Sequence, residues 1–113
     1  MQSRIHHAAI NVSDFDWYVR FFQDVFSMTV SKQRGEAPNR QLWFAQGIQL
    51  NETASAEETK DFRSILDHIS IGVDIDPVEA AAEAIAAGCS KCEGQGPHWF
   101  LLPNGYPVEL KPY

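Results

Sequence analysis

One sequence pattern occurs twice in this chain, and the repeat is the strongest constraint on its fold. Residues 5–12 (IHHAAINV) correspond to residues 66–73 (LDHISIGV), and residues 47–52 (GIQLNE) correspond to residues 106–111 (YPVELK). Because the two segments recur in the same order, the pattern indicates that one supersecondary unit is used twice. We therefore expect two similar modules, each with a polar residue at the same place in its first and its last strand.

The first copy predicts a strand, a helix and three further strands. Residues 5–12 alternate between polar and apolar side chains, which is typical of a strand. Ser13 and Asp14 are capping residues, and aromatic residues recur after them at helical spacing. Residues 14–26 are therefore predicted to form an amphipathic helix. The further strands of this copy are expected at residues 28–34, 40–45 and 48–52.

The second copy predicts the same order of elements. Residues 67–73 are expected to form its first strand. Asp76 and Pro77 predict the start of a helix over residues 77–87, which Gly88 ends. The further strands of this copy are expected at residues 89–93, 98–102 and 106–111.

The two copies predict an α+β protein in which a βαβββ module occurs twice. We interpret the 113 residues as a single domain by length. Module one covers residues 1–52 and module two covers residues 66–113. The polar residues 53–65 lie between them as a connector.

Composition and charge exclude several classes of protein. The chain is 44 % hydrophobic and 21 % charged, with a formal net charge of −6. A nucleic-acid surface needs a basic patch, and no apolar run reaches the length of a membrane span. The first residues lack the apolar segment of a signal peptide, so we expect a cytoplasmic protein. Cys89 and Cys92 form a lone C-x-x-C motif, which we interpret as two reduced thiols because a zinc ribbon needs a second pair.

The alternation along the strands predicts which side chains share a face of the sheet. The apolar faces of the first and last strands need cover, which the two helices supply. The opposite face then carries these residues: His7, Ala9, Asn11, Gln49, Asn51, His68, Ser70, Glu109 and Lys111. Alternation of this kind ordinarily means a face washed by solvent. Here a histidine opens both copies, and one ring of each pair (Trp43 or Phe44, Trp99 or Phe100) must lie on the same face, which favours a pocket.

Three segments carry a resemblance to a known family. They are HHAAINVSDFDWYVRFFQDVF (6–26), DHISIGVDI (67–75) and LPNGYPVEL (102–110). In these segments the chain resembles the vicinal oxygen chelate superfamily of glyoxalase I, bleomycin-resistance proteins, extradiol dioxygenases, methylmalonyl-CoA epimerase and fosfomycin-resistance enzymes. The resemblance implies two βαβββ modules that form a cup-shaped, partly closed, mixed eight-stranded sheet with the helices on its outer face.

Members of this superfamily place metal ligands on the first and last strands of each module. The resemblance therefore implies His7, Gln49, His68 and Glu109 as ligands, with His6 as an alternative to His7. Bacterial glyoxalase I carries glutamate where this chain has Gln49, whereas methylmalonyl-CoA epimerase carries glutamine there. Such a set suits one divalent transition metal, with zinc, nickel, manganese and iron as the alternatives.

The resemblance implies a metal-dependent lyase or isomerase, with Glu109 as the catalytic proton carrier. Its substrate would be a small molecule with vicinal oxygens that reacts through an enediolate-like intermediate. Because Gln49 removes one carboxylate, strict glyoxalase I activity is disfavoured. A bleomycin-resistance-like binding protein without catalysis is the first alternative, and a dioxygenase or a fosfomycin-type thiol transferase is another.

Further residues are candidates for contacts with the substrate, because they share the face of the predicted ligands or lie beside it. These residues are Asn11, Trp43, Ser70, His98 and Lys111. The aromatic residues of the first helix are interpreted as core or dimer contacts. The resemblance also implies a homodimer, with no nucleic-acid or membrane partner.

Overall fold

The computed structural model describes residues 1–54 and 65–112. The chain divides into two compact units, which follow the repeat closely. The N-terminal unit is His7–Asp67, and the C-terminal unit combines His68–Tyr113 with Met1–His6. Most of the predicted connector lies outside the described residues.

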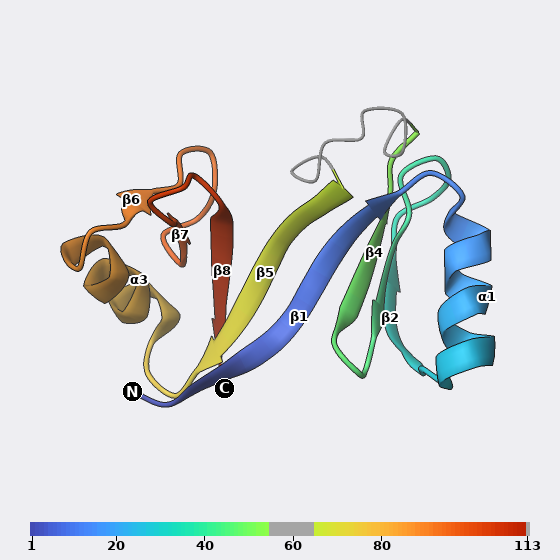
Figure 1. The fold of residues 1–113 in the computed structure, drawn as a ribbon, viewed down its shortest axis with the longest axis horizontal. Helices are drawn as coiled ribbons and strands as arrows, with labels where there is room; N and C mark the ends of the chain where they lie inside the picture. The colour runs from blue at the N-terminus through green and yellow to red at the C-terminus, as the bar shows by residue number, and fades with distance from the viewer. Residues whose placement is uncertain (55–64, 113) are drawn as a thin grey trace. The chain divides into compact units, whose positions relative to one another are not determined.

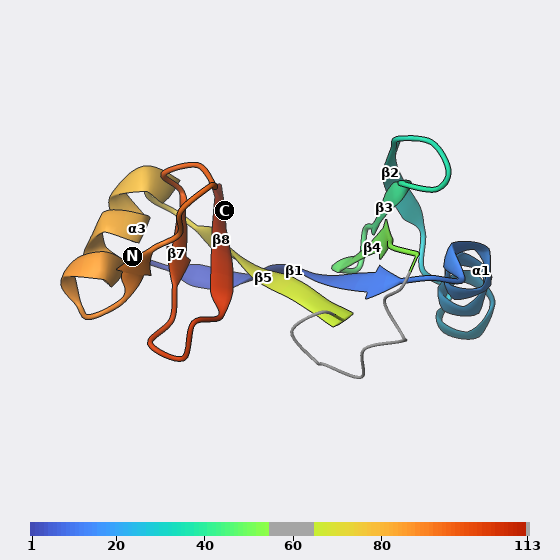
Figure 2. The ribbon, with the colours of Figure 1, turned by 90° about the horizontal axis from the view of Figure 1, so that it is seen from above.

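The N-terminal unit contains the elements of the first copy in the predicted order. They are β1 (Ser3–Val12, of which the first residues belong to the other unit), α1 (Phe15–Phe26), β2 (Val30–Arg34), β3 (Gln41–Phe44) and β4 (Ile48–Glu52). β1 runs parallel to β4, β4 pairs antiparallel with β3, and β3 pairs antiparallel with β2. The helix α1 lies on one side of β2, β3 and β4 (Figures 1 and 2). The core between them consists of Val12, Phe15, Leu42, Phe44 and Leu50.

The C-terminal unit repeats this arrangement. Its elements are β5 (Leu66–Val73, of which the first two residues belong to the other unit), α3 (Pro77–Ala86), β6 (Ser90–Lys91), β7 (Trp99–Leu101) and β8 (Pro107–Pro112). β5 runs parallel to β8, which pairs antiparallel with β7, and β7 pairs antiparallel with β6. The helix α3 packs on β7 and β8. The core consists of Val73, Ala80, Ala81, Phe100, Val108 and Leu110.

The order of hydrogen-bonded strands is β2-β3-β4-β1-β5-β8-β7-β6, which makes an eight-stranded mixed sheet within the described residues. The predicted α+β class with two βαβββ copies is therefore confirmed. The largest departure is β6, which spans Ser90–Lys91 instead of residues 89–93. Neither α1 nor α3, the two helices of the described residues, has the length and hydropathy of a membrane span.

The ends of the helices follow local chemistry to different degrees. Asp76 caps α3, because its carboxylate accepts a hydrogen bond from the backbone N–H of Val78 at 2.8 Å. Asp14 occupies the same position before α1 but makes no capping hydrogen bond with its side chain. Cys89 and Cys92 are free cysteines on either side of β6, as predicted for reduced thiols.

The aromatic face of α1 is only partly used by the core. Phe15 is buried, whereas Trp17 and Phe26 are 47 % and 57 % exposed. The rings of Trp17 and Phe21 stack at 5.0 Å, and Phe21 meets Phe26 edge to face at 5.5 Å. A continuous aromatic strip therefore faces outward in the N-terminal unit.

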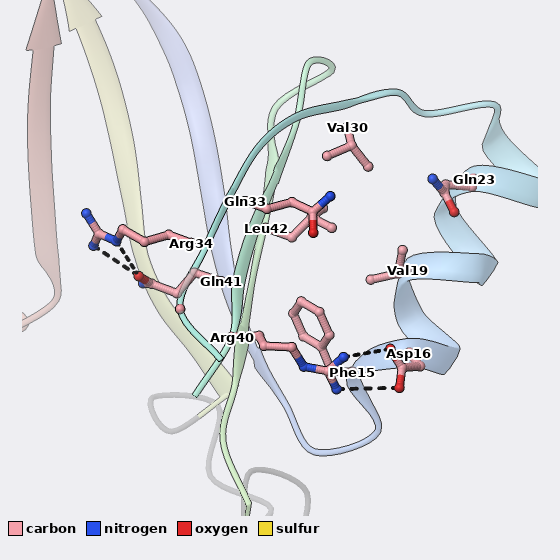
Figure 3. Close-up of a pocket in the computed structure, with 11 residues that line it drawn as sticks. Phe15, Asp16, Val19, Gln23, Val30, Gln33, Arg34, Arg40, Gln41 and Leu42 are labelled. Carbon is pink, nitrogen blue, oxygen red and sulfur yellow. Dashed lines mark hydrogen bonds and ion pairs between the residues drawn. The ribbon is translucent and has the colours of Figure 1, made fainter. Parts of the chain in front are cut away.

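Arg40 ties α1 to the sheet of the N-terminal unit (Figure 3). Its guanidinium donates to the carboxylates of Asp16 on α1 and Glu52 on β4, both at 2.9 Å. These hydrogen bonds raise the pKa of Arg40 and hold the pKa of Glu52 below its usual range. A cavity of about 180 Å³ lies beside this group, with Phe15, Val19 and Leu42 in its lining. Two carboxylates therefore neutralise the charge of Arg40, and these contacts attach α1 to the sheet.

Candidate functional site

The strand register confirms which residues share the polar face of the N-terminal unit. One row across the sheet is Ala9, Gln49, Trp43 and Lys32, in the order β1, β4, β3 and β2. The next row is Asn11, Asn51, Gln41 and Arg34. Residues directly opposite one another in paired strands project to the same side. His7 lies two residues before Ala9 on the same strand and therefore on the same face.

The C-terminal unit has the same row at the equivalent place. Ser70, Glu109 and Trp99 lie side by side on β5, β8 and β7. His68 lies two residues before Ser70, as His7 lies before Ala9. Trp43 and Trp99 are thus the rings on the polar face, whereas Phe44 and Phe100 pack in the two cores. In each copy a tryptophan therefore lies beside the predicted ligand of the last strand: Trp43 beside Gln49, and Trp99 beside Glu109.

The predicted ligands are not washed by solvent. His7 and Gln49 are each 4 % exposed, His68 is 7 % exposed and Ser70 is fully buried. The side chain of Glu109 is 12 % exposed. His6, the alternative to His7, is exposed. Burial of this kind excludes the interpretation of a plain outer sheet face, because polar groups are buried only where they find partners or serve a site.

An amide relay surrounds Gln49 in the N-terminal unit. Gln49 Nε2 donates to Asn51 Oδ1 at 2.8 Å, and Asn51 Nδ2 donates to Asn11 Oδ1 at 3.2 Å. Asn11 Nδ2 in turn donates to the Asp67 carboxylate at 3.4 Å. Gln41 Nε2 makes a second donation to Asn51 Oδ1 at 3.1 Å.

Charged groups at two ends set the direction of this relay. One is the guanidinium of Arg34, which donates to Gln41 Oε1 and so turns Gln41 Nε2 toward Asn51 Oδ1. The other is the carboxylate of Asp67. An ionised carboxylate only accepts hydrogen bonds, so the amide nitrogen of Asn11 must face it. Asn11 then presents its oxygen to Asn51, and Asn51 presents its oxygen to Gln49. The amide nitrogen of Gln49 is therefore committed to Asn51, and its carbonyl oxygen Oε1 is the atom left for a further ligand.

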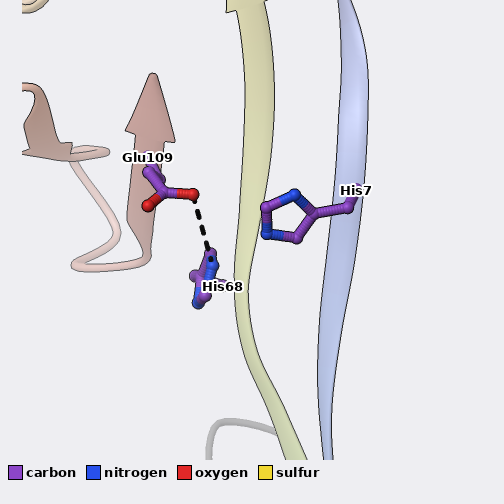
Figure 4. Close-up of side chains that lie close together, drawn as sticks. All are labelled: His7, His68 and Glu109. Carbon is purple, nitrogen blue, oxygen red and sulfur yellow. Dashed lines mark ion pairs between the residues drawn. The ribbon is translucent and has the colours of Figure 1, made fainter. Parts of the chain in front are cut away.

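Three side chains that can carry positive charge surround Glu109 in the C-terminal unit. Its Oε1 lies 3.8 Å from His68 Nε2, the pair joined in Figure 4. Its Oε2 lies 3.7 Å from Lys111 Nζ and 4.0 Å from His98 Nε2. The ring of His68 also meets Trp99 edge to face at 4.8 Å, which fixes the plane of the imidazole.

Among the described residues, the buried hydroxyl of Ser70 is a polar atom without a hydrogen-bond partner. It lies in register with Glu109 and on the face of His68. A buried hydroxyl of this kind costs free energy unless something occupies the space beside it. His7, His68 and Glu109 offer imidazole nitrogens and a carboxylate, which zinc, nickel, manganese and ferrous iron accept as ligands. The residues present therefore fit a divalent transition metal.

The structure brings the predicted residues together in two groups. Glu109, His68, His98 and Lys111 meet in the C-terminal unit, and Gln49 and Asn11 meet in the N-terminal unit. Asp67 was not among the predicted site residues, because no local sequence pattern indicates that its side chain contacts Asn11, 56 residues away in the chain. Lys32 and Arg34, which lie on the polar face beside Trp43, were not predicted either.

The fold recurs in solved structures. A hypothetical protein from Bacillus halodurans is 16 % identical, with a TM-score of 0.69 over 100 % of this chain and 97 % of that one. Methylmalonyl-CoA epimerase bound to methylmalonyl-CoA is 19 % identical, with a TM-score of 0.65 over 97 % and 94 %. The epimerase of Mycobacterium tuberculosis is 16 % identical, with a TM-score of 0.63 over 96 % and 87 %. At these identities the likeness concerns the fold alone.

A family model gives the stronger result. No curated protein sequence matches the chain significantly. The model described as Glyoxalase/Bleomycin resistance protein/Dioxygenase superfamily matches residues 4–100, which include both first strands and both helices. The chain belongs to the glyoxalase, bleomycin-resistance and dioxygenase superfamily.

Proposed function

We propose that this protein is a metal-dependent isomerase or lyase that moves a proton on a small substrate with neighbouring oxygen atoms. The observation that carries the proposal is the surroundings of Glu109. A carboxylate that is 12 % exposed lies within 4.0 Å of two imidazoles and an ammonium group. Such surroundings suit a group that changes its charge during a reaction.

In this proposal His7, His68 and Glu109 are metal ligands, and Gln49 is a weaker fourth ligand through Oε1. Each of the first three offers one ligand atom from a protected position. The direction of the amide relay supports Gln49, because it turns Nε2 toward Asn51 and leaves the oxygen Oε1 for the metal. When bound, the metal supplies Lewis acidity, which stabilises negative charge on the substrate oxygens.

The proton transfer is assigned to Glu109. Its carboxylate takes a proton from a substrate carbon next to a carbonyl and returns it at the same or the neighbouring carbon. Lys111 Nζ lies 3.7 Å from Oε2 and forms an ion pair with the carboxylate. The buried hydroxyl of Ser70 lies next to Glu109 in the register and is free to donate to a substrate oxygen.

Isomerisation is the form of this chemistry that we favour. A glyoxalase-type lyase of this superfamily uses two carboxylates, and this chain has Gln49 where the second one would lie. Structurally similar proteins include methylmalonyl-CoA epimerase in complex with methylmalonyl-CoA, an acyl thioester. Proton exchange on an acyl thioester is therefore the first reaction to test, and turnover of the methylglyoxal–glutathione hemithioacetal is the second.

Metal analysis is the experiment that tests the proposal. Protein purified without chelator should contain close to one transition metal per chain, and His68→Ala should lose it. His6→Ala is the matched control, because His6 is an exposed histidine next to a predicted ligand. A protein that holds no metal and rejects added nickel, zinc and manganese contradicts the proposal and favours a binding protein of the bleomycin-resistance type.

We further propose that the chain forms a homodimer. The aromatic strip on α1 supports this, because the exposed rings of Trp17 and Phe26 both contact the half-buried ring of Phe21. Light scattering at micromolar concentration should give twice the mass of the chain. A monomer at that concentration contradicts the dimer without affecting the proposed chemistry.

A further inference from the structure

Two positively charged side chains on β2 converge on one tryptophan of the polar face. Lys32 Nζ lies 5.1 Å from the centre of the Trp43 ring, and Arg34 Cζ lies 5.7 Å from it. Attraction to the face of an indole ring holds cations at such distances. Both cations of β2 are therefore held against the same ring.

Neither of these cations has a carboxylate partner among the described residues. The Nε and Nη2 groups of Arg34 both donate to Gln41 Oε1, at 3.1 and 3.0 Å, which fixes the plane of the guanidinium. Its remaining N–H groups and the three of the Lys32 ammonium stay available. Arg40 in the same unit differs, because Asp16 and Glu52 neutralise it. Arg40 supports the fold, whereas Lys32 and Arg34 have no such task.

The position of this pair relates it to the candidate site. Lys32, Trp43 and Gln49 lie in one row across β2, β3 and β4. Neighbouring strands are about 4.8 Å apart, so Lys32 lies roughly 10 Å across the sheet from Gln49. The cations therefore lie on the face of the proposed ligands, at a distance that one extended substrate can span.

We propose that Lys32 and Arg34, held in place by Trp43 and Gln41, form an oxyanion-binding subsite for the substrate. The ligand group is a phosphate or a carboxylate of the substrate, distant from the reacting oxygens. Available N–H donors on two adjacent cations match an anion with several oxygens. The assignment to the substrate rests on the proposed function, whereas anion binding by the pair does not.

The test measures anion binding on protein stripped of metal with a chelating resin, so its outcome does not depend on the metal. The indole N–H signal of Trp43, assigned with Trp43→Phe, is followed by NMR during titration with pyrophosphate. We expect a saturable shift, and the double variant Lys32→Gln/Arg34→Gln should weaken binding about tenfold or more. A parallel titration with malonate distinguishes a phosphate from a carboxylate preference.

Two control variants separate a specific subsite from general effects of charge. Lys32→Arg/Arg34→Lys keeps both charges and should bind pyrophosphate within about threefold of the parent, because the ring and both cations remain. Arg20→Gln removes one positive charge from α1, outside the sheet, and should leave the affinity unchanged. The absence of a saturable shift, or binding that survives Lys32→Gln/Arg34→Gln, overturns the subsite whatever the metal analysis shows.

Discussion

The two copies share their row of residues across the sheet but differ in what surrounds the last-strand residue. In the first copy, Gln49 belongs to a chain of amides that ends at the carboxylate of Asp67. In the second copy, Glu109 lies among His68, His98 and Lys111. The repeat therefore conserves position but not charge. One copy fixes the orientation of a neutral oxygen donor, and the other holds a carboxylate that can exchange a proton.

The tryptophans of the two rows differ in the same way. Trp43 is contacted by the cations of β2, a strand of five residues. Trp99 is contacted by the rings of His68 and His98, and its neighbouring strand β6 has two residues. The longer β2 gives the first copy room for an anion-binding pair beside the ring. The division suggests that the first copy positions the substrate and the second copy carries out the chemistry.

The strongest test of this division is Glu109→Gln. We expect kcat to fall about 10²- to 10⁴-fold, because general acid–base catalysis contributes that much. Gln49→Glu, which makes the two copies alike in charge, should cost far less and should raise any lyase activity on the hemithioacetal. Steady-state kinetics of both variants measure the difference. Equal losses of kcat in the two variants would show that both copies contribute equally to the chemical step.

The second test concerns Asp67 as a positioning residue. An amide at this position can accept or donate, so Asp67→Asn removes one of the two constraints on the direction of the relay, and the hydrogen bonds from Arg34 through Gln41 remain. We expect metal affinity to fall about tenfold, as it does for other outer-sphere partners. Metal titration by calorimetry measures this loss.

The control for Asp67→Asn is Gln49→Ala, because that variant has no side-chain amide for the relay to orient. In that background Asp67→Asn should leave metal affinity nearly unchanged, and a double-mutant cycle isolates the coupling. A loss of the same size in both backgrounds assigns the effect to Asp67 alone, for example through its neighbour His68, and not to the relay.

A third test compares how the helices are attached to their units. Arg40 joins α1 to Glu52, and this contact holds the pKa of Glu52 below its ordinary value. A carboxyl whose pKa is lower in the folded state stabilises the fold fully above its unfolded value. This contribution decreases as the pH falls below 4.5 and through the folded value. Glu52→Gln should therefore destabilise the protein at pH 7 and approach the parent in acid.

Urea unfolding of the parent and Glu52→Gln between pH 7 and pH 3 measures this convergence. The matched control is Glu83→Gln on α3, an exposed acid whose side chain has no ion-pair partner among the described residues. Its difference from the parent should stay small and flat over the same range. A constant difference for Glu52→Gln would show that packing, and not the ion pair, attaches α1 to the sheet.

Much of this structure could be predicted from the sequence, because it depends on local periodicity. The two helices, the first and last strands and the shared polar face follow from spacing alone. The face of the sheet on which Lys32 and Arg34 lie could not be predicted from spacing. The register shifts between Val30 and Lys32, so Val30 packs in the core while Lys32, two residues later, lies on the opposite face. A bulge has no reliable sequence signal, and simple alternation assigns these residues to one face.

Partners distant in the sequence form the other part that could not be predicted. Asp67 precedes a predicted ligand and has no repeat counterpart in function, because position 6 of the first copy is a histidine. Its role depends on a hydrogen bond to Asn11, which only the folded chain brings near. The short β6 has a similar origin, because its boundaries are set by pairing with β7 and not by its own composition.

The smallest expected effect concerns how each helix ends. Ser27 follows α1 with φ 54°, a left-handed conformation, whereas α3 ends at Ala87 with φ −82° and passes to Gly88 at φ +127°. A side chain with a Cβ atom is strained in the left-handed region and glycine is not. Ser27→Gly should therefore stabilise the protein by about 0.5–1 kcal/mol, after the greater freedom of glycine in the unfolded chain is counted.

Gly88→Ser is the matched reverse change. It should destabilise the protein through the backbone alone, because a Cβ atom at this position meets nothing within 4 Å. Urea denaturation of both variants gives the two free energies, and effects of the same sign would show that the two copies do not end their helices by the same rule.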